Sequence, residues 1–303
     1  MDEINLRQTV PKRFERGRAK FGGWYFKQQN ANDTVALIPA FHTDENGVPS
    51  ASLQVITANV SAFVQFKAEQ FLAGKRNLLV RLGNNVFSRS GCRLDAASDS
   101  ITLSGDLRFG ALRPPAHDVM GPLRFAPFME CRHHVYSLSH RVDGTLKING
   151  QEILFKNGTG YLEGDSGKSF PRRYVWTQWG QDGNCVMLSA AEIPACGRSF
   201  TGCVGIVYWE DQEYRIASYL GARLFCDRGD AVYVRQGKLE ILAEMRDKGY
   251  KSLYAPVLGG MTRSIRENAA CRVHYRCTLG DRVLFDFTAE NASYEDNWAQ
   301  NSP

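Results

Sequence analysis

The sequence predicts an all-β protein made of two antiparallel β-barrel halves that pack together, with little helix. Three observations predict this fold class. Apolar and polar residues alternate with a period of two in many short segments, as they do in strands with one buried face. Turn residues separate these segments at short intervals, which is typical of a barrel or a sandwich. An aromatic-rich segment opens each half, at Gly22–Lys27 and at Pro171–Trp176.

The clearest element of the first half is a hairpin. The dipeptide Asn149-Gly150 lies between two alternating apolar runs, 146–148 and 153–155. Asn-Gly in this setting is the strongest short signal of a two-residue hairpin turn. The segment Phe63–Leu72 fits a short helix and a strand equally well.

The second half shows the same strand pattern. Two apolar runs, Val232–Val234 and Leu239–Ala243, flank a turn at Gln236–Lys238. Between Cys271 and Thr278 apolar residues alternate strictly with polar ones, and Val283–Phe287 alternates again. Strands do not alternate with helical segments anywhere, which disfavours a parallel sheet.

The length of the chain suits two domains. At 303 residues it is long for one compact domain and allows two of about 150. We predict an N-terminal β-barrel domain over 1–158 and a C-terminal β-barrel domain over 159–303. A barrel of about eight to ten strands is in the size range that holds one small ligand. Hydrophobic residues make up 43% of the chain, which is typical of a protein with a packed core.

The charge pattern argues against a nucleic-acid partner. The formal net charge is +5, and no run of five like charges occurs. Lys12–Lys20 is the most basic stretch, and we expect a solvated N-terminal arm there. Contact of this arm with a lipid surface or an anionic ligand is the alternative.

The cysteines and the N-terminus predict a cytoplasmic location, with peripheral contact to a membrane left open. The N-terminus has neither the apolar core nor the cleavage site of a signal peptide, and no segment approaches the ~18 apolar residues of a membrane span. The eight cysteines include no Cys-x-x-Cys pair. We therefore expect reduced, mostly buried thiols and no metal site.

The most informative stretch is Gly160–Trp179. It contains two carboxylates two positions apart, Glu163 and Asp165, and then a strand that places Tyr174, Trp176 and Gln178 on one face. A carboxyl at a barrel mouth beside aromatic rings would have a raised pKa, the condition for a general acid near neutral pH. The ordinary alternative is a loop in which both carboxylates pair with Lys168, Arg172 or Arg173.

Two other motifs are weaker indications of a chemical function. Gly167-Lys168-Ser169 lacks the earlier glycine of a phosphate-binding loop and is followed by Pro171, so nucleotide binding is rejected. Cys131 and His133 would share a strand face and could form a thiol nucleophile, although no third, orienting residue can be named. Adjacent histidines at 133 and 134 point to opposite faces and cannot easily share a metal.

The order and spacing of several motifs resemble the tocopherol cyclase family, and its shorter bacterial branch more than the plant enzymes. The resemblance covers roughly Gly22–Phe287. It is carried by these segments: Gly23–Lys27, Pro127–His133, Gly160–Trp176, Ser199–Gly202, Glu213–Ala217 and Gly221-Ala222. The family usually reads Glu-Lys-Asp/Asn-Trp-Gly at the central motif. Here Glu163 and Asp165 are kept, while Gly164 and Ser166 replace the lysine and the tryptophan, which indicates a different pocket shape.

This resemblance implies a two-domain, lipocalin-like β fold, related at superfamily level to carotenoid hydratases and Diels–Alderase-like cyclases. It also implies a cofactor-independent reaction, in which an acid protonates the double bond of a prenylated hydroquinone and the phenol oxygen captures the tertiary cation. We take Asp165 as the candidate acid, supported by Glu163, with Glu130 or His133 as alternatives. The predicted ligand-binding residues are Trp24, Tyr25, Tyr174 and Trp176 as pocket lining and Gln178 or Arg172 for the head group.

A second hypothesis uses the same barrel without catalysis. The chain would then carry a hydrophobic small molecule, such as a lipid, and its carboxylates would be structural. Both hypotheses predict a hydrophobic ligand, no nucleic acid and no cofactor, and neither fixes the ligand or the oligomeric state.

Overall fold

The computed structural model describes residues 20–74, 77–195, 197–225, 229–247 and 250–298, and it consists almost wholly of antiparallel strands. Apart from Lys20, the basic stretch Lys12–Lys20 lies outside these residues. The first sheet contains β1 (Lys20–Gln29), β2 (Thr34–Thr43), β3 (Pro49–Thr57), β4 (Ser61–Phe66), β5 (Phe71–Ala73), β6 (Leu79–Leu82), β7 (Asn85–Ser88), β8 (Gly91–Ser98), β9 (Ile101–Phe109), β10 (Cys131–Ile148) and β11 (Gln151–Gly167).

The second sheet follows directly along the chain. It contains β12 (Tyr174–Gln181), β13 (Asn184–Ala195), β14 (Arg198–Trp209), β15 (Gln212–Ala217), β16 (Arg223–Phe225), β17 (Ala231–Gln236), β18 (Leu239–Met245), β19 (Lys251–Val257), β20 (Gly260–Leu279) and β21 (Arg282–Asp296). Among the described residues the only helical elements are short 3₁₀ turns at Ala68–Gln70, Gly121–Phe125 and Ser218–Leu220. The predicted all-β class is therefore confirmed.

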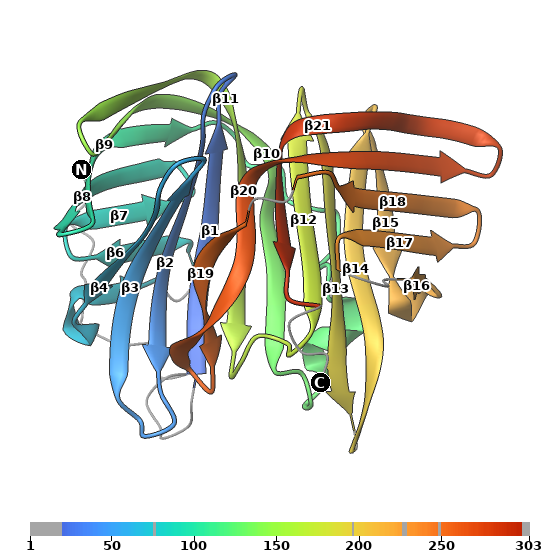
Figure 1. Cartoon of the computed structure of the whole chain (residues 1–303), viewed down its shortest axis with the longest axis horizontal. Coiled ribbons are helices and arrows are strands. Elements are labelled where there is room, and N and C mark those ends of the chain that lie inside the picture. The colour runs from blue at the N-terminus through green and yellow to red at the C-terminus, as the bar shows by residue number, and fades with distance from the viewer. Residues whose placement is uncertain (1–19, 75–76, 196, 226–228, 248–249, 299–303) are drawn as a thin grey trace.

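Both halves are built on the same plan. In the first, the opening strand β1 pairs with β2 on one side and with the closing strand β11 on the other. In the second, β12 pairs in the same way with β13 and β21. In Figure 1 the two halves lie side by side, with these opening and closing strands toward the middle of the molecule.

Several local predictions are confirmed. Asn149 and Gly150 join β10 to β11 with φ of 50° and 83°, as a type I′ turn requires. Of the two alternatives for Phe63–Leu72, the strand is correct up to Phe66, and a 3₁₀ turn and β5 follow. The predicted domain boundary at 158/159 falls inside β11, whose partners all belong to the first sheet. Sheet membership changes between Gly167 and Tyr174.

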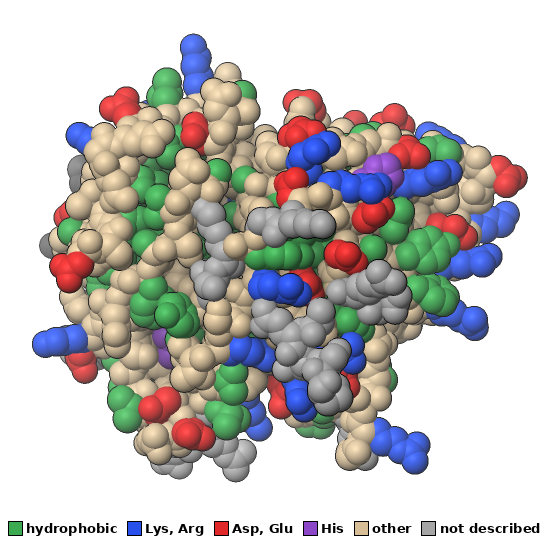
Figure 2. Space-filling model, viewed as in Figure 1, with side chains coloured by type: hydrophobic (Ala, Val, Ile, Leu, Met, Phe, Trp, Pro, Cys, Tyr) green, Lys and Arg blue, Asp and Glu red, His purple; other side chains and the backbone are tan. Residues whose placement is uncertain are grey.

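The alternation in β20 produces one buried and one charged face. Its even-numbered residues Arg272, His274 and Arg276 face outward and pair with acidic residues of β21. Figure 2 shows acidic and basic side chains side by side on this part of the surface. Charges of opposite sign on neighbouring strands make an ordinary solvated face.

The molecule has three clusters of buried hydrophobic residues. One fills the first half, with Leu37, Leu53 and Leu162 among its members, and one fills the second, around Tyr275. The third lies between the halves and contains aromatic residues of β1, β11 and β12: Tyr25, Tyr161, Tyr174 and Trp176. The parts of β1, β11 and β12 that lie between the halves are thus buried on both faces.

Each half extends an arm over the other. The segment 110–130, between β9 and β10, reaches the second half, where Arg113 donates to Gly183 O at 2.8 Å and Val119 O accepts from Tyr219 at 2.9 Å. The β19–β20 hairpin reaches back over the first half (Figure 1), where Tyr254 exchanges two hydrogen bonds with Gln54 at 3.0 and 3.1 Å. These arms hold the two halves together.

A lysine is buried between the halves, and removing it should stabilise the protein. Lys27 is fully buried, and its Nζ donates to Gln178 Oε1 at 3.0 Å and to Asn291 O at 3.3 Å. Burial lowers its pKa from 10.5 to about 7. Because the unfolded chain keeps the proton up to pH 10.5, the cost of burial is complete below pH 7 and declines as the pH rises above it.

We expect Lys27→Met to raise the free energy of unfolding by about 2 kcal/mol at pH 6, after the loss of two hydrogen bonds, and by much less at pH 9.5. Urea denaturation at both pH values measures the difference. A variant that is less stable than the wild type at pH 6 would contradict this expectation.

Candidate functional site

A cavity of about 150 Å³ lies between the two halves. Strands of both sheets line it, and so do both arms, through Met120, Leu123 and Met129 from one and Tyr254 and Pro256 from the other. Most of the lining is apolar or aromatic. Small side chains provide the space, since Gly23 of β1 lies against Ala40 of β2 in the wall.

The alternation of β11 aims its carboxylates at this cavity. Leu162 belongs to the core of the first half, whereas Tyr161 packs in the cluster between the halves. Glu163 and Asp165 share the face of Tyr161 because successive residues of a strand point to opposite sides. Glu163 is only 5% exposed, and both carboxylates line the cavity.

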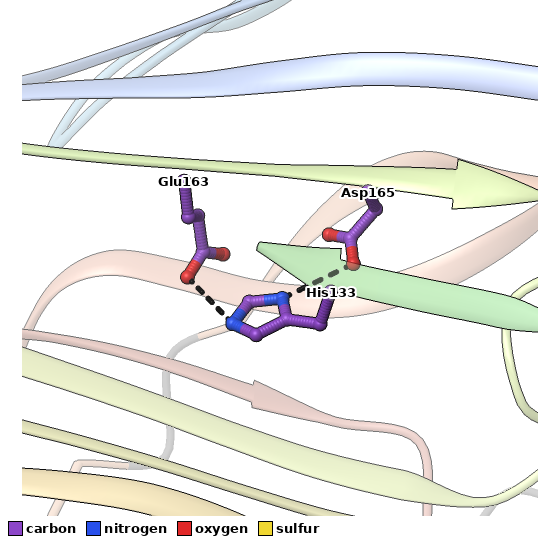
Figure 3. A group of neighbouring side chains, drawn as sticks. All are labelled: His133, Glu163 and Asp165. Carbon is purple, nitrogen blue, oxygen red and sulfur yellow. Dashed lines mark hydrogen bonds and ion pairs between the residues drawn. The ribbon is translucent and has the colours of Figure 1, made fainter. Parts of the chain in front are cut away.

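His133 lies between the two carboxylates (Figure 3). Its position on β10 is the register partner of Asp165 on β11. Its Nδ1 is 3.1 Å from Asp165 Oδ1, in hydrogen-bond geometry. Its Nε2 is 3.3 Å from Glu163 Oε2, an ion-pair distance without the alignment of a hydrogen bond. The imidazole thus links two carboxylates that are adjacent on one strand face.

Two hydrogen-bond donors also hold Glu163, one from its own strand and one from the second half. Its Oε2 accepts hydrogen bonds from the Tyr161 hydroxyl at 2.5 Å and from Trp176 Nε1 of β12 at 3.2 Å. Its Oε1 makes no hydrogen bond with the described residues. One oxygen is therefore fixed by three neighbours, and the other is available to a ligand.

Burial and close charges shift the proton affinities of this group. Burial raises the pKa of Glu163 from 4.5 to about 7, with His133 opposing the shift and Asp165 adding to it. Burial alone would lower the pKa of His133, but the two carboxylates outweigh it and raise that pKa to about 9. Near neutral pH the imidazole is charged and Glu163 exchanges its proton readily.

The same three residues could be considered as metal ligands, because their ligand atoms lie within 4.8 Å of one another. Each ring nitrogen already faces a carboxylate, Nδ1 that of Asp165 and Nε2 that of Glu163. The arrangement therefore also suits proton exchange between the carboxyls and the imidazole.

A second acidic pair, Glu267 and Glu295, belongs to the second sheet. Glu295 on β21 is the register partner of Glu267 on β20 and of Trp176 on β12. Its Oε2 accepts a hydrogen bond from Tyr174 at 2.9 Å, and it lines the cavity. Burial raises the pKa of Glu267 to about 8 and that of Glu295 well above its usual range.

The two halves exchange hydrogen bonds at these sites. Tyr25 of β1 is the register partner of Glu163 and donates to Glu267 of the second half at 3.2 Å. Trp176 of β12, the partner of Glu295, donates to Glu163 of the first half. Each opening strand thus supplies an aromatic donor to a carboxyl of the other half.

Sequence reasoning missed Glu267 and Glu295. A signal for Glu267 was present, because it stands between Ile265 and Ala269 on the buried face of an alternating strand. A charged residue in such a position needs a partner or a raised pKa. Nothing in the order of residues indicates that Tyr25, 242 positions away, would be that partner.

Eight of the ten predicted site residues line the cavity: Trp24, Tyr25, Glu130, His133, Glu163, Asp165, Tyr174 and Trp176. The structure does not bring Gln178 and Arg172 to it. Gln178 shares a strand face with Tyr174 and Trp176, as predicted, but binds Lys27 instead. Arg172 is exposed, and its backbone carbonyl accepts a hydrogen bond from Asn297.

The structure supports neither the ion-paired loop nor the Cys131 nucleophile that the sequence left open as alternatives. Glu163 and Asp165 contact His133, whereas Lys168, Arg172 and Arg173 were the expected ion-pair partners. The Cys131 thiol lies 3.5 Å from Asp165 Oδ1, and burial together with this carboxylate raises its pKa well above the usual value. A thiol in that state is a poor nucleophile.

Comparisons with known proteins support the fold. No protein-family model and no curated protein matches the chain. It is similar to the crystal structure of a protein from Nitrosomonas europaea provisionally designated AttH, with a TM-score of 0.56 and 11% identity over 97% of this chain and 98% of the other. A DUF3598-family protein of unknown function from Nostoc punctiforme covers 95% of this chain and 99% of its own at 8% identity, with a TM-score of 0.16.

The first likeness shows the fold alone, which is the predicted lipocalin-like, all-β fold. In the part of the chain that the structure describes, no helix has the length and apolar character to cross a membrane.

Proposed function

We propose that this protein is a tocopherol cyclase-like isomerase that closes a prenylated quinol or a related polyene lipid by acid catalysis, without a cofactor. The observation that carries the proposal is Glu163, a buried carboxyl with a pKa of about 7 on the wall of a largely apolar cavity. The motif resemblance of the sequence to that family supports it independently. The lipocalin-like fold is consistent with it, although one fold hosts many functions.

In the first step Glu163 gives its proton to the less substituted carbon of the prenyl double bond. The π electrons form the new C–H bond, and a tertiary cation remains at the neighbouring carbon. Tyr161, Trp176 and His133 stabilise the carboxylate that is left, because all three approach its Oε2. The structure thus favours Glu163 over Asp165 as the acid, with Asp165 holding His133 in place.

The cation must survive until the phenol oxygen reaches it. The rings of Trp24, Tyr25, Tyr174 and Trp176 line the cavity, and their electron-rich faces favour a positive charge. Tyr25 and Trp176 pack edge to face at 5.3 Å, which fixes both rings. An apolar lining also excludes the water that would otherwise capture the cation.

Ring closure completes an isomerisation. A lone pair of the phenol oxygen forms the C–O bond to the tertiary carbon, and the oxygen loses its proton to the Glu163 carboxylate. The acid is regenerated, no electrons leave the substrate, and the product has the composition of the substrate. The reaction therefore needs no oxidant and no metal-bound intermediate.

The test is incubation of the purified protein with a prenylated hydroquinone under anaerobic conditions, with detection of the chromanol by mass spectrometry. Ala40→Leu should lower turnover and ligand affinity at least about tenfold, because the larger side chain occupies the cavity. Ala191→Leu, on the lining strand β13 of the second sheet, should act in the same way. Ala97→Leu, on the exposed face of β8, is the control.

Tight binding without any chromanol would contradict catalysis and favour the carrier hypothesis. Equal turnover in all three variants, with unchanged thermal unfolding, would place the reaction outside this cavity.

A further inference from the structure

Acidic residues dominate the titratable groups of the cavity wall. Five of its lining residues are carboxylic acids and two are histidines, and none of the described lining residues is a lysine or an arginine. The acids are Glu130, Glu163, Asp165, Glu192 and Glu295. A buried anion in such a cavity would lack a counter-ion and would repel its neighbours.

Neither histidine offers a free positive charge. His133 has a carboxylate facing each ring nitrogen, so its charge is already balanced. His42 is 2% exposed, and burial lowers its pKa to about 4, so it is neutral near pH 7. Its Nε2 contacts Ser52 Oγ at 2.9 Å, and its buried Nδ1 has no hydrogen-bond partner among the described residues.

That unpartnered nitrogen indicates that the wall is incomplete without a ligand. Buried polar atoms of native proteins almost always have a partner, and a neutral imidazole can bond a hydroxyl or a carbonyl. A neutral imidazole nitrogen suits a neutral or cationic head group that offers a hydroxyl or an N–H.

Arg263 has a guanidinium that bonds to a residue of the wall. Its Nη2 donates to Phe170 O at 3.0 Å, and its side chain is not among the lining residues. Among the described residues, this guanidinium is a candidate partner for an anionic head group. Arg263 is therefore the residue to vary when anion binding is tested.

From this wall we propose that the cavity selects neutral and cationic amphiphiles over anionic ones, and that an ammonium amphiphile binds more tightly than the alcohol of the same chain length. The inference rests on the proposed function, because a site that stabilises a tertiary carbocation should also bind a stable cation of similar shape. Carboxylates beside aromatic faces are the usual means of recognising an ammonium group. Fatty-acid anions are then poor ligands, which sets this cavity apart from that of a fatty-acid carrier.

The experiment compares three ten-carbon probes below their micelle concentrations: decyltrimethylammonium, decanol and decanoate. Isothermal calorimetry of the wild-type protein at pH 7.5 should give the order ammonium, alcohol, carboxylate, with at least about a tenfold difference between the first and the last. Glu295→Gln should weaken ammonium binding several-fold and leave decanol within about twofold, because a bound ammonium group favours the ionised form of this carboxyl, which glutamine cannot adopt, while the shape is kept. Glu290→Gln, on the exposed surface, is the matched control.

Decanoate that binds as tightly as the ammonium probe would overturn the inference. If that binding disappears in Arg263→Met, the cavity edge holds an anion site instead. Failure of all three probes to bind would also overturn it. Chromanol formation is measured separately, so ammonium preference without turnover contradicts only the proposed catalysis, and turnover without ammonium preference contradicts only this inference.

Discussion

Replacing Glu163 with glutamine should lower turnover by about a thousandfold while ligand affinity changes by no more than about threefold. Glutamine keeps the shape of the side chain and can still accept from Tyr161 and Trp176, so the wall of the cavity stays in place. It cannot deliver a proton to an alkene. Single-turnover kinetics with a prenylated hydroquinone measures the loss, and equilibrium binding measures the retained affinity.

Asp165→Asn separates the roles of the two carboxylates. Asp165 holds His133 through Nδ1, so we expect about a tenfold loss of turnover and a shifted pH profile, since the imidazole loses one of its two carboxylates. A loss in Asp165→Asn as large as that in Glu163→Gln would move the acid to Asp165. Undiminished turnover in Glu163→Gln would remove Glu163 from the reaction.

The second large effect concerns stability against pH. Burial raises the pKa of Glu267 from 4.5 to about 8, so the folded state binds a proton that the unfolded chain has released. The associated stability is complete below pH 4.5 and is lost as the pH rises through 8. The linkage amounts to at most about 5 kcal/mol for this group, from about 1.4 kcal/mol per pKa unit.

We therefore expect Glu267→Gln to raise the free energy of unfolding by roughly 3 kcal/mol at pH 8.5 and to change it little at pH 5. Glutamine still accepts the Tyr25 hydroxyl and carries no charge. Urea denaturation at the two pH values measures the difference, with the exposed Glu290→Gln as control. A variant that is destabilised equally at both pH values would show that Glu267 is not held protonated by burial.

The strands and their faces could be predicted because they depend on local pattern. The Asn149-Gly150 turn and the alternation of 271–278 each rest on neighbouring residues, and both are present in the structure. The faces of β12 follow from the same period: Tyr174 and Trp176 pack between the halves, and Val175 packs in the second core.

The arrangement between the halves could not be predicted in this way. Glu163 and Trp176 are 13 positions apart but belong to different sheets, and Tyr25 and Glu267 are 242 positions apart. Which carboxyl is buried, and which donor faces it, depends on how two curved sheets pack. The sequence therefore indicated Glu163 and Asp165 as a pair and took Asp165 as the acid, because it does not reveal that Glu163 is the more deeply buried of the two.

The two arms could not be predicted from the sequence pattern either. The segment 110–130 is rich in proline and lacks a strand period, and nothing local indicates that it would bind Gly183 and Tyr219. Met120 and Leu123 of this segment, and Tyr254 of the other arm, complete the cavity wall. A site to which each half contributes residues of the other's wall can be identified only from the tertiary structure.

Turnover in deuterium oxide tests the central claim, that a carboxylic acid in this cavity protonates a carbon–carbon double bond. A prenylated hydroquinone is incubated with the protein in deuterium oxide, and the chromanol is analysed by mass spectrometry and NMR. We expect one non-exchangeable deuterium, on the former alkene carbon next to the new C–O bond, and about a thousandfold slower formation of this product with Glu163→Gln. Unchanged substrate recovered from the saturated protein, or a chromanol without deuterium at that carbon, would contradict the claim.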